Sequence, residues 1–584
     1  MKAAAVSPAL FSCQAPAAEL SRLPSISTKW IDVHCHVFNG RDLPIYEFIK
    51  KTRFSHANPS DWVAAAAVAF LAGGLQRKAP SVADEIAQLS SGAVAAAPAA
   101  ADPVAGCMRL RARAFGAPDG SGVTSGEPPA PQEGAQAAAS DEMFGTPRDA
   151  MALMMLDRAL RDTSIRAPAP VGAGPPPMPS DRELEQFGAF IQANREPASS
   201  VRGPGPAASA SKDSAHARMG TIVGRFFDWG LMFASTRNAL VSNLASLYPP
   251  NANLMLTPAI VDYDAWLGSH DTYPANQLRV MEHIAIIRAR QGMPVHTFAA
   301  FDPWRCLRMR SAGVDTLAHL ATALAAGSAV GVKLYPPMGF AAAGNAGRDT
   351  SKYPFPADLV RLTKGRPGLE LDAVLDELFD YCAANGIPVM AHCGPSNAIA
   401  PDYADLAAPS YWRNALSKSR PHRGELRLNL GHFGGIWDLG PAEPVQRAWA
   451  EEISALMMDY PNVYADIGYF GAVLHPEQSD VRDATVTFIA DQANKPSSVL
   501  RNRLMYGSDW SMIGLEPLSR SYALRAVEAL SPIWPGEQQE YLTWRNAAAF
   551  LGLGPNDQTR RRLLDFYAAN QIDAAPLLAF DPTT

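Results

Sequence analysis

Two histidines stand two residues apart near the start of the chain, in the stretch IDVHCH. A run of mostly apolar residues leads into His34 and His36, as is typical of the end of a buried strand. Successive side chains on a strand point to opposite faces, so both imidazoles would point the same way. Two such rings form half of a divalent-metal site, and zinc binds them readily. In a chain with 12 histidines the pair alone is a weak signal, so the prediction depends on partners elsewhere.

Those partners follow other apolar runs much further along the chain. His392 ends the run PVMAH, His432 follows LRLNLG, and Asp509 follows LMYGS. The carboxyl ends of parallel strands meet at one edge of a sheet, so these side chains would gather there. Imidazole and carboxylate are the donors that a divalent metal prefers. The pattern therefore predicts a metal site built from several strand ends.

The elements that must position these residues are short apolar strands alternating with helices. Such strands suit a parallel sheet buried on both faces, and eight strand–helix repeats make a (β/α)8 TIM barrel of the α/β class. The barrel places its active site at the carboxyl ends of the strands, where the candidate ligands lie. The predicted strands cover residues 29–37, 254–260, 295–301, 330–335, 388–392, 426–431, 463–467 and 504–507.

Between the first two strands, residues 41–215 are rich in Ala, Pro, Gly and Ser. We interpret this region as a long, partly disordered insertion that leaves from the strand end carrying the histidine pair and could cover the site as a lid. Low-complexity stretches cover 92–140, 167–179 and 197–211, and helices are predicted at 61–75, 81–89, 147–161 and 181–194. The domains expected are 1–40, a leader and first strand; 41–215, the insertion; and 216–584, the remaining barrel and C-terminal helices.

Composition excludes several classes of protein. The net charge of -6 gives no basic excess for nucleic acid. Six cysteines in 584 residues do not make a disulfide framework, and Cys35 and Cys393 are expected to be buried fillers. The N-terminus lacks the long apolar core of a signal peptide, and no apolar run is long enough to span a membrane. A cytoplasmic location is expected.

Several motifs together resemble the amidohydrolase superfamily, in particular its amidohydrolase-related branch of metal-dependent hydrolases and non-oxidative decarboxylases. The resemblance covers residues 28–40 and about 220–555 and leaves out the insertion. The motif set is specific for the superfamily and not for a substrate. The matching stretches are DVHCH, GVKLYP, MAHCG, GHFGG, YGSDW and the closing WRNAAAFLGL.

The resemblance implies a role for each matching position. His34, His36, His392 and Asp509 would ligate one divalent metal, zinc before manganese. His432 would be a further ligand or would polarise the substrate. Binuclear members carry a carboxylated lysine on strand four, which leaves Lys333 open between that role and a substrate contact. The predicted substrate contacts are Lys333, Tyr335, Arg305 and Trp510.

The function expected first is hydrolysis of an amide, lactone or ester in a small organic substrate. The metal would lower the pKa of a bound water toward about 7, Asp509 would take its proton as general base, and the metal with His432 would polarise the carbonyl. Two alternatives stay open: non-oxidative decarboxylation of a small aromatic acid at the same site, and a barrel that binds metal or ligand without turnover. The partners expected are a small molecule and a second copy of the chain, with neither nucleic acid nor membrane.

Overall fold

The structure is a computed structural model. It describes residues 27–42, 79–91, 235–263, 274–396, 398–400, 402–514, 516 and 518–584. The predicted low-complexity stretches and the helices predicted at 61–75, 147–161 and 181–194 lie outside these residues, as does most of the predicted lid. The chain divides into two compact units, one of residues 1–38, 82–89 and 237–584, the other of residues 39–81 and 90–236. The strands and helices below belong to the first unit.

Eight strands occur in the described residues, at the eight predicted places. All neighbouring strands pair in parallel, β1 with β2 and then β3 to β8 in chain order. Isolated parallel bridges, Leu256 with Val295 and Ala259 with Phe298, join β2 to the next strand. The strands are β1 (Lys29–Cys35), β2 (Asn253–Pro258), β3 (Thr297–Ala300), β4 (Ala329–Leu334), β5 (Val389–His392), β6 (Leu428–Gly431), β7 (Val463–Asp466) and β8 (Leu504–Met505).

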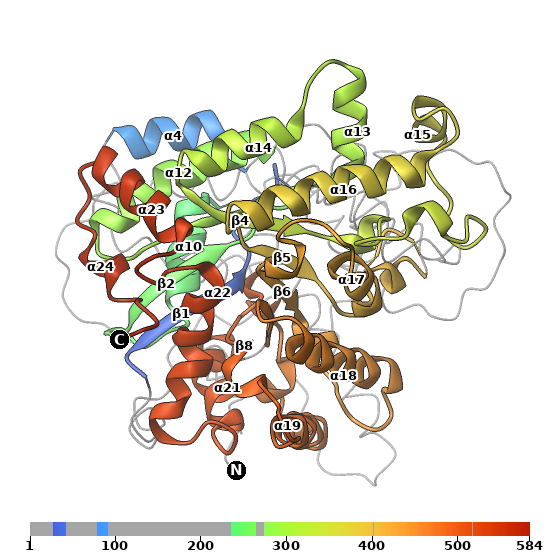
Figure 1. Cartoon of the computed structure of the whole chain (residues 1–584). Helices are drawn as coiled ribbons and strands as arrows, with labels where there is room; N and C mark the ends of the chain where they lie inside the picture. Colours follow the sequence, from blue (N-terminus) through green and yellow to red (C-terminus); the bar gives the residue numbers. More distant parts are fainter. Residues whose placement is uncertain are drawn as a thin grey trace, which may run out of the picture. The chain divides into compact units, whose positions relative to one another are not determined.

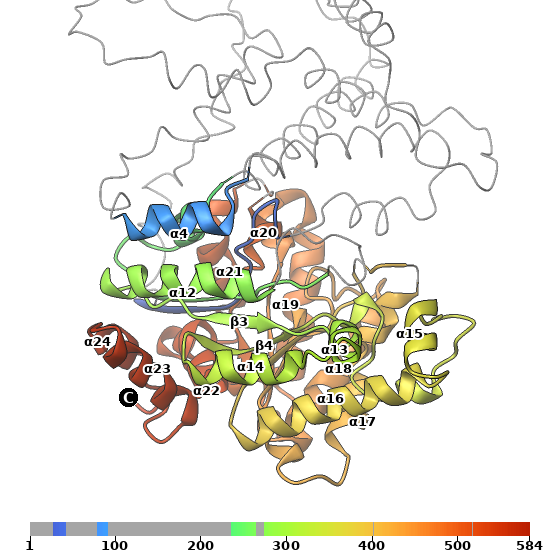
Figure 2. The same ribbon diagram turned by 90° about the horizontal axis from the view of Figure 1, so that it is seen from above.

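Helices separate the strands and lie outside them (Figure 1). From β2 onward they include α12 (Pro274–Arg290), α13 (Pro303–Ser311), α14 (Thr316–Ala325), α15 (Ala357–Leu362), α16 (Pro367–Ala384), α17 (Pro409–Leu416), α18 (Pro444–Asp459) and α19 (Ser479–Ala493). After β8 come α20 (Trp510–Ile513), α21 (Tyr522–Leu530), α22 (Asn546–Leu551), α23 (Gln558–Ala569) and α24 (Ala575–Leu578). Helix α12 packs on β3, and α14 packs on β4 (Figure 2). Among the described residues, no helix combines the length and apolar character needed to cross a bilayer.

Four helical segments lie between or after the strands. Helix α13 begins at Pro303, three residues after β3, and the proline occupies the first helical position, where its missing N–H costs nothing. Before β2 the structure describes the short helix α10 (Arg237–Ala245). The helix predicted at 81–89 is confirmed as α4 (Val82–Ser90). After β8, Tyr541–Arg545 is a π-helical turn that leads into α22.

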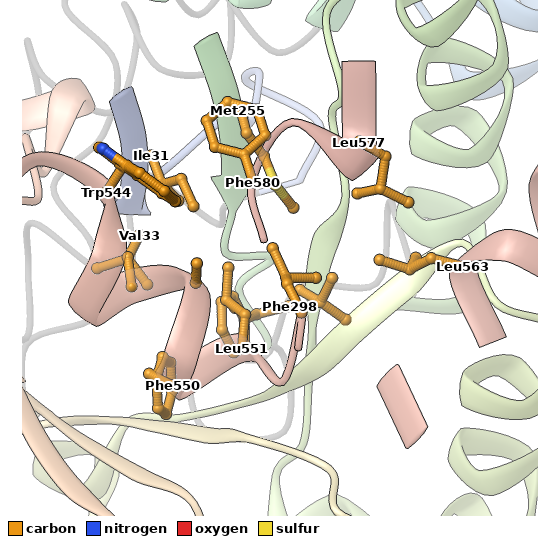
Figure 3. Close-up of a cluster of buried hydrophobic side chains, with 14 of the residues drawn as sticks. Ile31, Val33, Met255, Phe298, Trp544, Phe550, Leu551, Leu563, Leu577 and Phe580 are labelled. Carbon is orange, nitrogen blue, oxygen red and sulfur yellow. The ribbon is translucent and has the colours of Figure 1, made fainter. Parts of the chain in front are cut away.

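The core of the unit fixes which face of β1 carries the histidines. Ile31 and Val33 are fully buried in an apolar cluster with Trp544, Phe550 and Leu551 from the C-terminal helices (Figure 3). Because strand side chains alternate, burial of these two residues on one face directs Asp32 and His34 to the other face. A slip by one residue would reverse both faces, so the apolar contacts specify the register of the strand.

Candidate metal centre

The predicted ligands lie at the carboxyl ends of their strands. His34 lies near the end of β1 and His36 follows that strand directly. His392 is the last residue of β5, His432 follows β6, and Asp509 lies four residues beyond β8. All five side chains are buried. The structure therefore brings to one region residues that are up to 475 positions apart in the sequence, from His34 to Asp509.

Three of these residues form a compact donor group. The ligand atoms of His34, His36 and Asp509 all lie within 4.8 Å of one another. His36 Nε2 is 3.3 Å from Asp509 Oδ1, and the two imidazole rings are 5.5 Å apart between centroids. Two imidazoles and one carboxylate in this arrangement fit a divalent cation such as zinc.

Hydrogen bonds to the Nδ1 atoms assign the protons on three of the rings. His36 Nδ1 is 3.0 Å from Ala259 O, and His432 Nδ1 is 2.9 Å from Gly468 O. His34 Nδ1 lies 2.9 Å from a carboxylate oxygen of Asp466. Carbonyl and carboxylate oxygens only accept, so each Nδ1 donates and each Nε2 of a neutral ring keeps its lone pair. This is the tautomer that a metal-ligating histidine needs, held by partners outside the ligand set.

Charge states agree with this donor set. Burial lowers the pKa of His36 to about 3 and that of His432 to about 4, so both rings are neutral at neutral pH. Burial acts to raise the pKa of Asp509, but its electrostatic interactions with His34, His432, His36 and Lys333 outweigh burial and lower that pKa overall. The site thus presents the neutral rings of His36 and His432 beside an ionised carboxylate.

Asp466, the last residue of β7, is the centre of the hydrogen bonds around the donor group. Its carboxylate accepts from His34 Nδ1, from Asn429 Nδ2 at 2.7 Å, and from the backbone N–H groups of His432 at 3.1 Å and Gly468 at 2.8 Å. Burial opposes ionisation, yet the charges of His34 and His432 and these bonds hold the pKa of Asp466 well below its usual range. His34, His432 and Asp466 also lie close enough to hold a cation. Because the Asp466 oxygens are already occupied by donors, we interpret this second group as support for the first.

The sequence analysis assigned no role to Asp466 or to Asn429. The position of Asp466 at a strand end was the available signal. Gly468 has a steric requirement that was also missed: a Cβ there would lie 2.9 Å from both Asp466 Oδ1 and His34 Nδ1. Any larger residue would push into the pair that orients His34.

His392 lies beside the three-residue group and is a member of neither candidate group found in the described residues. Its Nδ1 is 3.1 Å from His432 Nε2, and Ser396 Oγ lies 2.7 Å from its Nε2. His392 Nε2 also lies 3.1 Å from the carbonyl oxygen of Gly394, which can only accept, so this nitrogen contacts both a hydroxyl and a carbonyl oxygen. His432, neutral and protonated at Nδ1, presents an unprotonated Nε2 to His392.

Backbone strain collects at the site. His432, Tyr469 and Asp509 have φ angles of 68°, 63° and 49°, in the left-handed region that residues with a Cβ rarely adopt. Such conformations cost about 1–3 kcal/mol each and persist where the surroundings impose them, often at functional sites.

Two predicted substrate contacts border the histidines. Lys333 Nζ is 3.2 Å from His34 Nε2, and burial lowers its pKa to about 8 against the opposing charges of Asp466 and Asp509. The ring of Tyr335 lies 4.5 Å from that of His392 between centroids. The third, Trp510, follows Asp509 at the start of α20 and is buried.

The fourth predicted contact, Arg305 on α13, is already paired. It donates two hydrogen bonds to Asp262, from Nε at 2.6 Å and from the guanidinium end at 2.5 Å.

The neighbouring carboxylate of Asp302 has fewer hydrogen-bond partners. Asp302 caps α13 by accepting from Trp304 N, while its Oδ2 is buried without a hydrogen-bond partner among the described residues. Burial, followed by the charge of Asp262, raises the pKa of Asp302 to about 7.

This pKa predicts that asparagine at position 302 stabilises the protein. The folded state disfavours the ionised form, so Asp302 destabilises the fold increasingly as the pH rises from the ordinary value of 3.8 toward about 7. Asp302→Asn keeps the capping oxygen and removes the charge. We expect about 1–2 kcal/mol more stability at pH 8 and no gain at pH 4, measured by urea unfolding. Three pKa units correspond to about 4 kcal/mol, and the expected gain is smaller because the new amide is itself buried.

Asp315→Asn is the matched control. Asp315 caps α14 in the same way, but it is exposed and paired with Arg310, and its pKa is lowered. Equal gains in both variants, or a gain for Asp302→Asn that is the same at both pH values, would contradict the assignment.

Comparisons with known proteins agree with the geometry. Residues 296–553 match the family model described as amidohydrolase. No curated protein sequence matches the chain. A crystal structure of an amidohydrolase II aligns at 17% identity over 54% of this chain and 89% of its own, with a TM-score of 0.31. A structure named as a metal-dependent hydrolase from Lactobacillus casei aligns at 16% identity over 50% and 78%, with a TM-score of 0.29. Both structural alignments are too loose to bear on the fold.

Proposed function

Because residues 296–553 belong to the amidohydrolase superfamily, we propose that this chain is a metal-dependent hydrolase of a small organic substrate. The bond broken would be an amide, lactone or ester. The observation that carries the proposal is the donor group of His34, His36 and Asp509, whose ligand atoms lie within 4.8 Å of one another. The Nδ1 bonds of both histidines, to Asp466 and to Ala259 O, leave a lone pair on the Nε2 of each neutral ring; these atoms lie 3.2 Å from Lys333 Nζ and 3.3 Å from Asp509 Oδ1.

The donor set fits one divalent cation, zinc before manganese. His34, His36 and Asp509 would hold it, with the neighbouring His392 as the fourth ligand. When bound, such a cation supplies Lewis acidity, which acidifies a coordinated water and polarises a carbonyl oxygen. Asp466, which accepts hydrogen bonds from Asn429 and from backbone N–H groups, already orients the His34 ring that would bind the cation.

The chain's own residues would handle the proton. Asp509 is ionised and can take the proton of the attacking water. His432 has an unprotonated Nε2, since its Nδ1 donates to Gly468 O, and this nitrogen lies 3.1 Å from His392 Nδ1. Lys333 and Tyr335, on and after β4, would bind the substrate.

We also propose that the eight strands close into a (β/α)8 barrel interrupted by an insertion at about 41–215. In support, Val33 N donates to Tyr506 O at 3.3 Å and Asp509 N donates to His34 O at 2.7 Å, which links the last strand to the first. The bridges from β2 to β3 supply the remaining connection. Closure would explain how residues from β1 and β8 share one donor group.

Decarboxylation of a small aromatic acid is the second candidate, and Lys333 favours it. This buried ammonium group lies beside His34, and the Tyr335 ring is close to His392. A cation next to an aromatic surface suits a substrate that carries a carboxylate on a ring.

A substrate panel distinguishes the candidates. Zinc-loaded protein would be assayed on lactones, esters and amides by proton release and on hydroxybenzoates by carbon dioxide release. We expect proton release that is lost on chelation and restored by zinc. Carbon dioxide release alone would replace hydrolysis by decarboxylation, and stoichiometric zinc without turnover on any substrate would favour a binding barrel.

A further inference from the structure

One buried hydroxyl joins the two segments that complete the metal centre. Tyr522, the first residue of α21, is fully buried. Its hydroxyl lies 3.1 Å from Ile467 O and 3.2 Å from Gly507 O, and it accepts from Phe470 N at 3.0 Å. The single proton is shared between the two carbonyl groups, and the oxygen accepts the amide. The hydroxyl is thus fully used, and each partner is backbone.

The first segment, residues 467–470, orients His432 and Asp466. Gly468 lies between two of the groups that Tyr522 binds. Its carbonyl accepts from His432 Nδ1 at 2.9 Å, and its N–H donates to Asp466 at 2.8 Å. Tyr469 next to it has a φ of 63°, which a free loop would relax. A contact that holds Ile467 and Phe470 therefore maintains the strained turn between them.

The second segment, residues 507–509, orients Asp509. Tyr522 binds the carbonyl of Gly507, and Ser508 donates to Asp32 from both N and Oγ. Asp509 N donates to His34 O at 2.7 Å, with Asp509 in the left-handed conformation. The segment is closely packed at Gly507, where a Cβ would lie 2.8 Å from His34 Cβ. Small shifts at Gly507 would therefore reach the Asp509 carboxylate.

We infer that Tyr522 is a positioning residue of the metal centre, which sets the Asp509 carboxylate and the His432 ring relative to each other through its hydroxyl. The inference rests on the proposed function, since it assumes a metal at the donor group. Packing alone does not account for the contacts, because a phenylalanine ring would fill the same space. The hydroxyl is the only part of the side chain that makes the three backbone bonds.

The test compares Tyr522→Phe with Tyr567→Phe in the full-length protein. Tyr567 is also buried, and its hydroxyl bonds to His296 Nε2 at 3.1 Å, among residues other than those of the metal centre. Zinc affinity is measured by competition with a chelator, and the absorption spectrum of the cobalt-substituted protein reports ligand geometry. Thermal unfolding of the metal-free variants shows how much stability each hydroxyl contributes.

We expect Tyr522→Phe to bind zinc about tenfold more weakly. This is the low end of the range for residues that support metal ligands, because Tyr522 binds the backbone next to the ligands and not the ligands themselves. The cobalt spectrum of Tyr522→Phe should shift. Tyr567→Phe should bind zinc within a factor of about two of the wild type, although it should lose about as much stability as Tyr522→Phe. Wild-type zinc affinity and an unchanged cobalt spectrum in Tyr522→Phe would overturn the positioning role alone. Failure of the wild type to bind zinc would overturn the proposed function and this inference together.

Discussion

Replacing Asp509 with asparagine is expected to lower kcat by about 1,000-fold or more, since a general base contributes about 10²–10⁴ and this one is also a ligand of the proposed metal. Asparagine has nearly the same shape, and it tolerates the left-handed backbone that Asp509 adopts. The fold should therefore survive, and the loss should come from the missing negative charge. The measurement is steady-state turnover on the best substrate from the panel, at saturating zinc.

Asp402→Asn serves as the control for the substitution itself. Asp402 is also an aspartate with a positive φ, 62°, and it is exposed. Its variant should retain wild-type turnover. If Asp509→Asn kept more than about a tenth of the wild-type kcat, Asp509 would be neither the proton acceptor nor an essential ligand.

Replacing Asp466 with asparagine is expected to weaken zinc binding by about 10- to 100-fold, the usual effect of losing a group that supports metal ligands. Both carboxylate oxygens accept hydrogen bonds, from His34 and Asn429 side chains and from two backbone N–H groups. An amide offers one oxygen, so its NH2 group must face a donor. His34 would then lose the bond that fixes its tautomer. Chelator competition measures the affinity.

Stability should fall in the same variant, by about 2–4 kcal/mol, because a buried donor is left unpaired. The pKa of Asp466 is depressed in the folded state, so its stabilising effect is present above the ordinary value of 3.8 and is lost as the pH falls below it. The free energy of unfolding of the variant should therefore fall less than that of the wild type as the pH is lowered through this range. Asp459→Asn, at an exposed partner of Arg413, should change neither property. Wild-type zinc affinity in Asp466→Asn would contradict the supporting role, even with reduced stability.

The residues that follow strands were accessible from the sequence. His34, His36, His392, His432 and Asp509 each follow an apolar run, and parallel pairing brings such ends together. The alternation of side chains along a strand also predicted that His34 and His36 point the same way, and in the structure Ile31 and Val33 enter the core. Short stretches of sequence are enough to predict where the strands lie, and the strand ends in turn define the edge of the sheet that carries the site.

Contacts between distant segments were not accessible. Nothing near Asp466 in the sequence shows that four donors from β1, β6 and the following loop converge on it. Arg305 seemed free to bind a substrate because its partner, Asp262, is 43 residues away. The same holds for the hydroxyl of Tyr522, whose acceptors lie in two loops. Charge pairing and tautomers depend on these long-range neighbours, which one sequence leaves undetermined.

Metal content of the purified protein tests the central claim most directly. Elemental mass spectrometry would be applied to the wild type, to His36→Ala and to Asp509→Ala, all prepared without chelators. The donor group predicts about one zinc or manganese per chain in the wild type and loss of the metal in both variants, since each removes one donor. A wild-type protein that carries no metal, and takes up none on dialysis against zinc, would contradict the account.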